Sequence, residues 1–290
     1  MTVAGGYLLP FLAVHLGCLL IFVTGVTADM VAVFFVTFPL RAFGITAGYH
    51  RYFSHRSFET SRPFRLVLAV LGCLALQKGV LWWVAMHRRH HRHPDRPGDP
   101  HSPLRDGFWF SHMGWFLAAD APVVEAASVP DLARYPELVW LDRWFIVPPL
   151  VLAAVLFGLG GLPWLVAGFF AATTFVWHGT YAVNSLGHHV GRRRFDTPDG
   201  SRNSAWLALL AWGEGWHNNH HRFPASARQG FRWWEVDLTW YCLCGLRRLG
   251  VVWDVVEPPA DLRGGPVARR QPRCHGDFTE PVLEPGAHAG

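Results

Sequence analysis

Long apolar runs constrain the fold of this 290-residue chain more than any other feature. Residues 7–27 and 30–48 form two such runs with a very short turn between them. Residues 144–159, slightly short and with two adjacent prolines, are joined to a fourth run, residues 162–183, by a Gly-Gly pair. A transmembrane helix needs about 20 mostly apolar residues, and 51% hydrophobic residues are typical of a membrane protein. The pattern therefore predicts four transmembrane helices in two hairpins.

Nine of the 17 histidines lie in four short segments. The segments are His50-Arg-Tyr-Phe-Ser-His55, His87-Arg-Arg-His90-His91, Asn184-Ser-Leu-Gly-His188 and His217-Asn-Asn-His220-His221. The three histidines of His-x-x-His-His share one face of a helix, and neutral imidazole is a good ligand for iron, copper, zinc or nickel. No Cys-x-x-Cys pair accompanies them, so a structural zinc site is not indicated. The segments offer enough imidazole nitrogens for two metal ions.

A fifth apolar stretch, residues 66–86, is interrupted by a Gln-Lys-Gly sequence. Its length alone would allow a membrane crossing. A crossing would place His55 and His87 on opposite sides of the bilayer, where they could not share a metal site. We therefore interpret this stretch as a buried or interfacial segment.

With four crossings, all the histidine segments lie on one side of the membrane. Residues 49–143 and 184–256 then form a cap on that side, and residues 1–256 form one membrane-bound domain. The cap is rich in arginine, whereas the short turns near residues 28 and 160 contain neither lysine nor arginine. The positive-inside rule therefore predicts a multi-pass membrane protein whose metal site and termini are all cytoplasmic. Residues 257–290, rich in Pro, Gly and Arg, are predicted to be a flexible tail.

The residues around the histidine segments resemble those of a known family, the membrane fatty-acid desaturases of the acyl-CoA delta-9 (stearoyl-CoA) type. The similarity includes Gln77, Trp83, residues 99–115 and residues 213–224, and it extends from about residue 43 to residue 254. It implies an all-α integral membrane protein with four transmembrane helices and a cytosolic helical cap that holds a histidine-ligated di-iron centre. By this resemblance Asn184 reaches one iron through water, and the direct ligands are His50, His55, His87, His90, His91, His188, His217, His220 and His221.

The resemblance implies an oxidoreductase that uses O2 to introduce a cis double bond into a saturated long-chain acyl substrate, at the delta-9 position of an acyl-CoA. Such a reaction breaks unactivated C–H bonds, which needs oxygen activated on iron (Fe2+/Fe3+) rather than an acid, a base or a nucleophile. No catalytic side chain beyond the iron ligands is therefore expected. No Gly-x-Gly-x-x-Gly motif is present for a flavin or nicotinamide, so two electrons must come from a separate ferredoxin, cytochrome b5 or reductase. The lipid bilayer is a further expected partner, and a nucleic-acid partner is not expected.

Regiospecificity in such an enzyme should come from a narrow, bent apolar tunnel that passes the irons. Gln77, Trp83, Trp115 and Trp216 are predicted to line it. An interfacial anchor or a packing residue of the cap is an equally good interpretation of each tryptophan except Trp83, whose position matches the family. Three other histidines, His101, His112 and His189, either orient a ligand or are ordinary hydrogen-bonded residues of the cap.

Two related enzymes stay open as alternatives, and a metal transporter is a third possibility from a different class of protein. A related di-iron hydroxylase of fatty acyl chains or lipids would use a similar set of histidines, and an acyl-lipid desaturase could act at a different position. A metal transporter would place ionisable ligands at mid-membrane, whereas here they gather at the ends of the apolar runs. The sequence leaves open whether the acyl chain is carried by CoA, a carrier protein or a phospholipid, and it does not indicate the preferred chain length.

Overall fold

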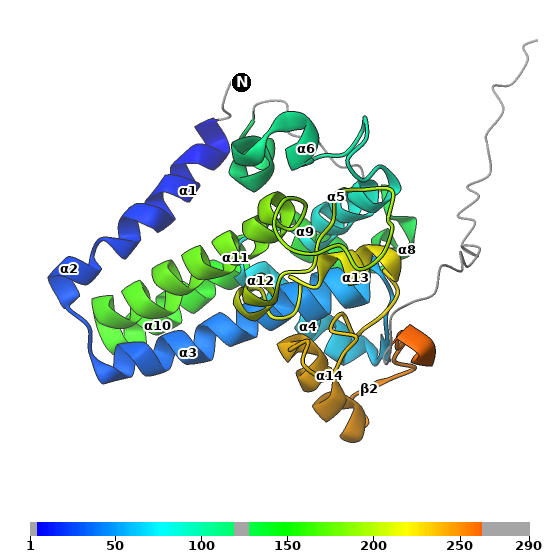
Figure 1. Ribbon diagram of the computed structural model, residues 1–290. Coiled ribbons are helices and arrows are strands. Elements are labelled where there is room, and N and C mark those ends of the chain that lie inside the picture. The colour runs from blue at the N-terminus through cyan, green and yellow to red at the C-terminus, as the bar shows by residue number, and fades with distance from the viewer. Residues whose placement is uncertain (1–4, 119–127, 263–290) are drawn as a thin grey trace, which may run out of the picture.

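The computed structural model describes residues 5–118 and 128–262, and it is mostly helical (Figure 1). The longest helical stretches are built from α1 (Gly5–Cys18), α2 (Ile21–Thr24), α3 (Ala28–Phe43), η1 (Gly44–Ser54), α10 (Val147–Leu165), η4 (Val166–Ala171) and α11 (Ala172–Leu186). The shorter elements are β1 (Glu59–Thr60), α4 (Arg62–Leu74), α5 (Val80–Arg92), α6 (Pro103–Asp106), η2 (Phe110–Gly114), α7 (Trp115–Leu117), α8 (Pro130–Ala133), α9 (Pro136–Arg143), α12 (Ala205–Leu210), α13 (His217–Arg222), α14 (Leu238–Arg248), β2 (Val252–Trp253) and η5 (Ala260–Leu262). Strands β1 and β2 pair as a small antiparallel sheet.

Three helical stretches are long and apolar enough to cross a membrane, namely Tyr7–Thr24, Ala28–Ser54 and Val147–Leu186. The third is broken at Gly161, whose φ of 62° and ψ of −154° are not helical. Leu156 and Gly168, on opposite sides of this break, lie against each other, so the chain has reversed its direction between them. The reversal falls where the sequence predicts the turn of the second hairpin. The number of membrane crossings itself stays a prediction.

The segment predicted not to cross the membrane forms two short helices. Helices α4 and α5 have 13 residues each, which is fewer than the roughly 20 that a crossing needs. The turn between them includes Leu76 and Lys78, whose φ values of 56° and 72° are incompatible with a continuous helix. The Asp142 carboxylate accepts hydrogen bonds from the backbone N–H groups of Leu81 and Trp82 and thereby caps the first turn of α5.

One charged side chain is buried between the long helices. Arg41 of α3 donates hydrogen bonds to the carbonyl oxygens of Gly168 (2.8 Å) and Phe169 (3.2 Å) and to the hydroxyl of Thr173 (2.5 Å). An unpaired polar group in such surroundings is costly. Arg41 therefore ties α3 to η4 and α11 through the hydrogen bonds of its two terminal nitrogens.

The largest apolar core lies where η1, α4, α5, α9 and α14 meet, beside the ends of the long helices. The first residues of the predicted flexible tail pack in a smaller apolar cluster of the cap. Leu262 is buried against Phe195 and Phe231, and its carbonyl oxygen accepts a hydrogen bond from Arg194. The packed chain thus continues to residue 262, beyond the predicted boundary at 256, and residues 263–290 of that tail lie outside the described ranges.

Candidate metal centre

The nine predicted histidines come from the end of η1, the last turns of α5, the turn after α11, and α13. The π-helical geometry of η1 explains the spacing of its pair. A π-helix bonds residue i to residue i+5, and the N–H of His55 donates to the carbonyl oxygen of His50. Their rings consequently lie on the same side of the helix, with centroids 4.9 Å apart, whereas an α-helix would point them apart.

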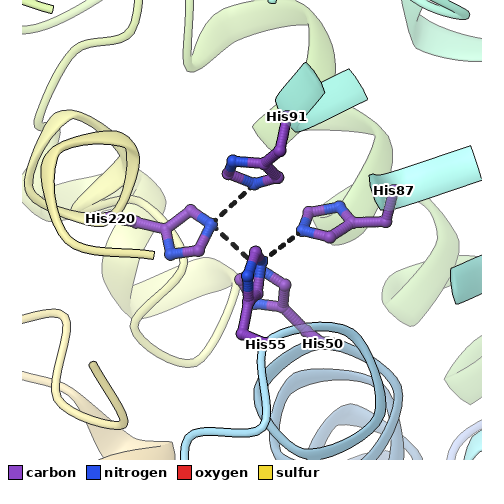
Figure 2. Close-up of side chains that lie close together, drawn as sticks. All are labelled: His50, His55, His87, His91 and His220. Atoms are coloured by element: carbon purple, nitrogen blue, oxygen red, sulfur yellow. Dashed lines mark hydrogen bonds between the residues drawn. The ribbon is translucent and has the colours of Figure 1, made fainter. Parts of the chain in front are cut away.

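Five of these histidines form one group, which Figure 2 shows in close-up: His50, His55, His87, His91 and His220. Their Nε2 atoms point toward a common centre. The Nε2 atom of His220 lies 3.1 Å from that of His50 and 2.9 Å from that of His91. The Nε2 atoms of His55 and His87 are 2.7 Å apart.

The other four histidines form a second group: His90, His188, His217 and His221. The Nε2 atom of His217 lies 3.1 Å from those of His188 and His221, and the Nε2 atoms of His90 and His221 are 3.3 Å apart. Each His-x-x-His-His motif is therefore shared between the groups. In each motif the two histidines at i and i+4 belong to the same group, and the histidine at i+3 belongs to the other group.

Carboxylates hold the far side of four of the nine rings. The Nδ1 atom lies 2.5 Å from Glu214 in His50, 3.0 Å from Asp99 in His90, 2.8 Å from Asp95 in His188 and 2.9 Å from Asp199 in His221. A neutral imidazole that donates its Nδ1 proton to a carboxylate keeps a lone pair on Nε2, the atom that faces the group centre. The four carboxylates therefore fix these rings in the form that binds a metal.

Burial favours the neutral form of several of these imidazoles. It lowers the pKa values of His87, His91, His217 and His220 well below the ordinary value, and the neighbouring histidines lower them further. Burial also lowers the pKa of His221, to about 4, although Asp199 opposes the shift. Neutral imidazole is the form that binds transition metals.

The carboxylates themselves are ionised. Burial alone would raise the pKa of Asp95, but hydrogen bonds from His188 and Ser102 outweigh it and bring the pKa to about 2. The same balance of burial against a histidine partner lowers the pKa values of Asp99, Asp199 and Glu214. Ionised carboxylates can accept the Nδ1 protons that the metal-binding form of each ring requires.

The donor set fits two metal ions. The Nδ1 atom of His90 faces Asp99, and the Nδ1 atom of His221 faces Asp199. When each ring donates its Nδ1 proton to its aspartate, the two Nε2 lone pairs point at each other across 3.3 Å. Two such lone pairs repel each other, and a cation between them removes the repulsion. Two groups made only of imidazole nitrogens favour a transition metal such as iron over calcium or magnesium, which prefer oxygen ligands.

Two cavities adjoin the histidines. The larger, of about 460 Å³, is mainly apolar and reaches from α1 and the start of α10 to His87. The smaller, of about 50 Å³, lies between α3 and α11 and is lined by His50, His87, His90 and His217. Both cavities are lined by Trp83, His87, Thr180 and Asn184, so they meet beside the metal-binding groups. Asn184, expected near one iron, lies at this junction.

Three of the four predicted tunnel residues line the larger cavity. They are Gln77, Trp83 and Trp115. Trp216 lines neither cavity, because its ring is buried in the cap and its Nε1 donates a hydrogen bond to the carbonyl oxygen of Val236 (2.8 Å). Packing of the cap is thus the better interpretation of Trp216.

The remaining histidines differ in their surroundings. His101 is buried and stacks on His90, with ring centroids 4.5 Å apart. His112 binds Ser185 and His178 instead of a member of either group. His189 is exposed. Of the three, only His101 is placed to orient one of the nine histidines.

The fold and the site together define a class of protein, a helical chain with membrane-length apolar helices and paired histidine groups that could hold two metal ions. The particular family follows from comparison with known proteins. The chain belongs to the fatty acid desaturase family, whose model matches residues 27–243. It is therefore an oxidoreductase of lipid metabolism that introduces double bonds into fatty acyl chains.

Relatives within the family act on different acyl carriers. The chain is 42% identical to the sn-2 palmitoyl-lipid 9-desaturase of Nostoc sp. over 74% of its own length and 77% of the relative. It is 38% identical to the sn-1 stearoyl-lipid 9-desaturase of Synechocystis sp. over 89% and 82% of the two chains. It is 41% identical to the acyl-CoA 5-desaturase AL21 of Anemone leveillei over 74% and 68%.

Proposed function

We propose that this desaturase introduces a cis double bond at the delta-9 position of a saturated long-chain acyl group, with O2 as co-substrate and two iron ions as cofactor. The observation that carries the proposal is the arrangement of two all-histidine groups along the wall of an apolar cavity. The iron ligands would be the nine histidines named above, with Asn184 binding through water. Bound iron would supply the oxidising chemistry that unactivated C–H bonds require.

The protein's own residues have three tasks in this reaction. The imidazoles hold the metals, and the four carboxylates fix the ring orientations. Apolar walls position the alkyl chain and exclude water. Polar side chains beside the histidines set the shape of the wall, since Gln77 donates to the Thr180 hydroxyl (3.1 Å) and accepts from Trp83 Nε1 (3.4 Å).

The proposal has two forms, which differ in whether the acyl chain is carried by CoA or by a membrane lipid. The sequence resemblance implies an acyl-CoA substrate, and one relative is an acyl-CoA desaturase, although it acts at position 5. The two relatives named above that act at position 9 are both acyl-lipid desaturases. We therefore favour a lipid-linked acyl chain over acyl-CoA.

The proposal includes four membrane crossings by residues 1–256, with the metal centre and both termini in the cytoplasm. The direct contact between the two hairpin turns supports this topology. Trp164, just after the Gly161 reversal, donates a hydrogen bond to Asp29 at the start of α3 (2.6 Å). These turns lie at the ends of the helices remote from the histidine groups, as a single-sided metal site requires. A separate redox protein would then deliver two electrons from the cytoplasm.

Expression in an unsaturated-fatty-acid auxotroph, followed by gas chromatography of the lipids, tests this function. We expect growth without added unsaturated fatty acid, a cis-9 product and about two irons per purified chain. His87→Ala should abolish the product, and His189→Ala, at an exposed position, is the matched control. A product that is only hydroxylated, or an active preparation that contains zinc alone, would contradict the proposal.

A further inference from the structure

Lys78 is the only lysine of the chain, among 26 basic residues. It lies in the turn between α4 and α5, and its ammonium group faces aromatic rings. The Nζ atom is 2.8 Å from the centroid of Tyr7, 5.6 Å from that of Trp82 and 5.9 Å from that of Phe145. Within residues 5–118 and 128–262 no carboxylate forms an ion pair with it.

An ammonium group that faces aromatic rings and has no carboxylate partner is able to bind an anion. Burial lowers the pKa of Lys78 to about 8, because desolvation disfavours the charged form. The aromatic rings compensate only part of the lost hydration. A negatively charged oxygen beside Nζ would compensate for the rest of the lost hydration, since hydrogen bonds between ionised groups are stronger than those between neutral groups.

Lys78 stands at the outer end of the larger cavity. Tyr7, Ile146 and Leu150 also line this end, and they are 44%, 36% and 55% exposed. The inner end is lined by buried residues such as Trp177 and by His87. The cavity therefore opens on the outer surface of the helices, between α1 and the start of α10, and leads inward to the histidines.

The surface around this opening is suited to lipid. The same two helices expose Leu9, Leu12 and Val151 next to the lining residues, and both belong to stretches of membrane-spanning length. Tyr and Trp side chains mark the level of the lipid headgroups in membrane proteins, and here Tyr7 and the exposed Trp144 lie at the same ends of α1 and α10 as Lys78. The opening thus begins at headgroup level and continues along the hydrocarbon.

Resting on the proposed function, we propose that the saturated chain of a glycerophospholipid enters sideways from the bilayer between α1 and α10 while Lys78 binds the lipid phosphate. The phosphate remains at the membrane surface and the acyl chain passes Trp83 to reach the histidines. This route assigns phospholipid as the substrate class. Acyl-CoA, which arrives from water, would not need an opening along the apolar faces of two spanning helices.

Photocrosslinking in nanodiscs tests the route. The full-length, iron-loaded protein is reconstituted with phosphatidylglycerol that carries a diazirine in its acyl chain, and crosslinked peptides are identified by mass spectrometry. We expect crosslinks within residues 7–14, 76–87 and 144–150. Ala13 is an exposed residue that lines the cavity, so a tryptophan at this position should obstruct the opening. Ala13→Trp should therefore reduce crosslinking at residues 76–87 at least tenfold. The matched control Ala154→Trp lies on the exposed surface of α10 outside the cavity lining and should leave crosslinking unchanged.

Desaturation assays test the role of Lys78. They compare three substrates that carry the same acyl chain: phosphatidylglycerol, an uncharged galactolipid and acyl-CoA. Lys78→Met should lower kcat/KM about tenfold for phosphatidylglycerol but not for an uncharged galactolipid, since one hydrogen bond to a charged group is lost. Lys78→Arg should retain the preference for phosphate. Crosslinks confined to other surfaces would overturn the lateral route and leave the proposed function intact. Desaturation of acyl-CoA but not of phospholipid would overturn both the lateral route and the lipid-linked form of the proposed function, while the desaturase activity itself would stand. If the expected crosslinks formed but none of the three substrates gained a double bond, the proposed function would be overturned and the lateral route would stand.

Discussion

Replacing Asp199 with asparagine should weaken metal binding at the four-histidine group while leaving the surrounding loop intact. One carboxylate oxygen of Asp199 serves His221 alone, at 2.9 Å from its Nδ1 atom. The other accepts hydrogen bonds from the Ser201 N–H (2.9 Å) and the Thr197 hydroxyl (3.1 Å). In Asp199→Asn the amide oxygen can keep the loop bonds, whereas the amide NH2 faces His221. His221 must then accept at Nδ1 and carry its proton on Nε2.

A proton on Nε2 removes one ligand atom from the group, because this atom faces His90 and His217. Loss of a hydrogen-bond partner that orients a metal-binding histidine typically reduces metal affinity 10- to 100-fold, which corresponds to about 1.4–2.7 kcal/mol. The five-histidine group does not include His221, so its ion should be retained. The variant should thus pass through a state with one iron per chain.

Iron content after dialysis against graded concentrations of a chelator measures this effect. Asp196→Asn is the matched control, because Asp196 lies in the same loop, is fully exposed and makes only a 3.6 Å ion pair with Arg193. A circular dichroism melt should show that both variants keep their helices. If Asp199→Asn released both irons at the same chelator concentration as the control, the carboxylate would not determine the form of His221.

Three further predictions concern the site and its supports. His87→Ala and His217→Ala, one in each group, should each abolish desaturation measured by gas chromatography while the protein still inserts in membranes, and substantial activity in either variant would show that one group suffices. The metal-free protein should lose stability in urea titrations as the pH falls from about 6.5 toward 4. The pKa of His221 is about 4 in the folded protein, so the unfolded chain binds this proton more strongly. Equal free energies of unfolding at pH 7 and pH 5 would contradict this prediction. Arg41→Met should destabilise the protein in detergent by about 1–3 kcal/mol, because two carbonyl oxygens and the Thr173 hydroxyl each lose a buried hydrogen bond. Arg56→Met, at an exposed ion pair, should cost less than about 1 kcal/mol.

Local spacing made the histidines predictable, because each motif lies on one helical segment. The two-group arrangement was not predictable in this way. It depends on how α5 and α13 face each other, so that His87 and His90 of a single motif enter different groups. The spacing of five between His50 and His55 also indicates nothing by itself, since it aligns side chains only in a π-helix.

The carboxylates illustrate the limit of sequence reasoning more strongly. Asp99 follows its partner His90 by nine residues, but Asp95 and His188 are 93 residues apart. Neither Asp95 nor Asp199 belongs to a motif with a recognisable spacing, and only the tertiary fold brings them to the histidines. Trp216 was expected at the tunnel for its position beside a histidine motif, yet the cap packing directs its ring elsewhere.

The carboxylates that orient the rings have a further consequence for the charge of the cap interior. Asp95, Asp99, Asp199 and Glu214 together carry four negative charges, while the neutral imidazoles carry none. Arg51 lies between Glu214 (3.1 Å) and Asp237 (3.0 Å) and balances one of these two charges, so the five carboxylates together leave four negative charges. Two divalent cations would supply an equal positive charge, so this region is electrically neutral only when both metal positions are filled. Filling the site should therefore be strongly coupled to folding of the cap, with the second ion required as much for charge balance as for chemistry.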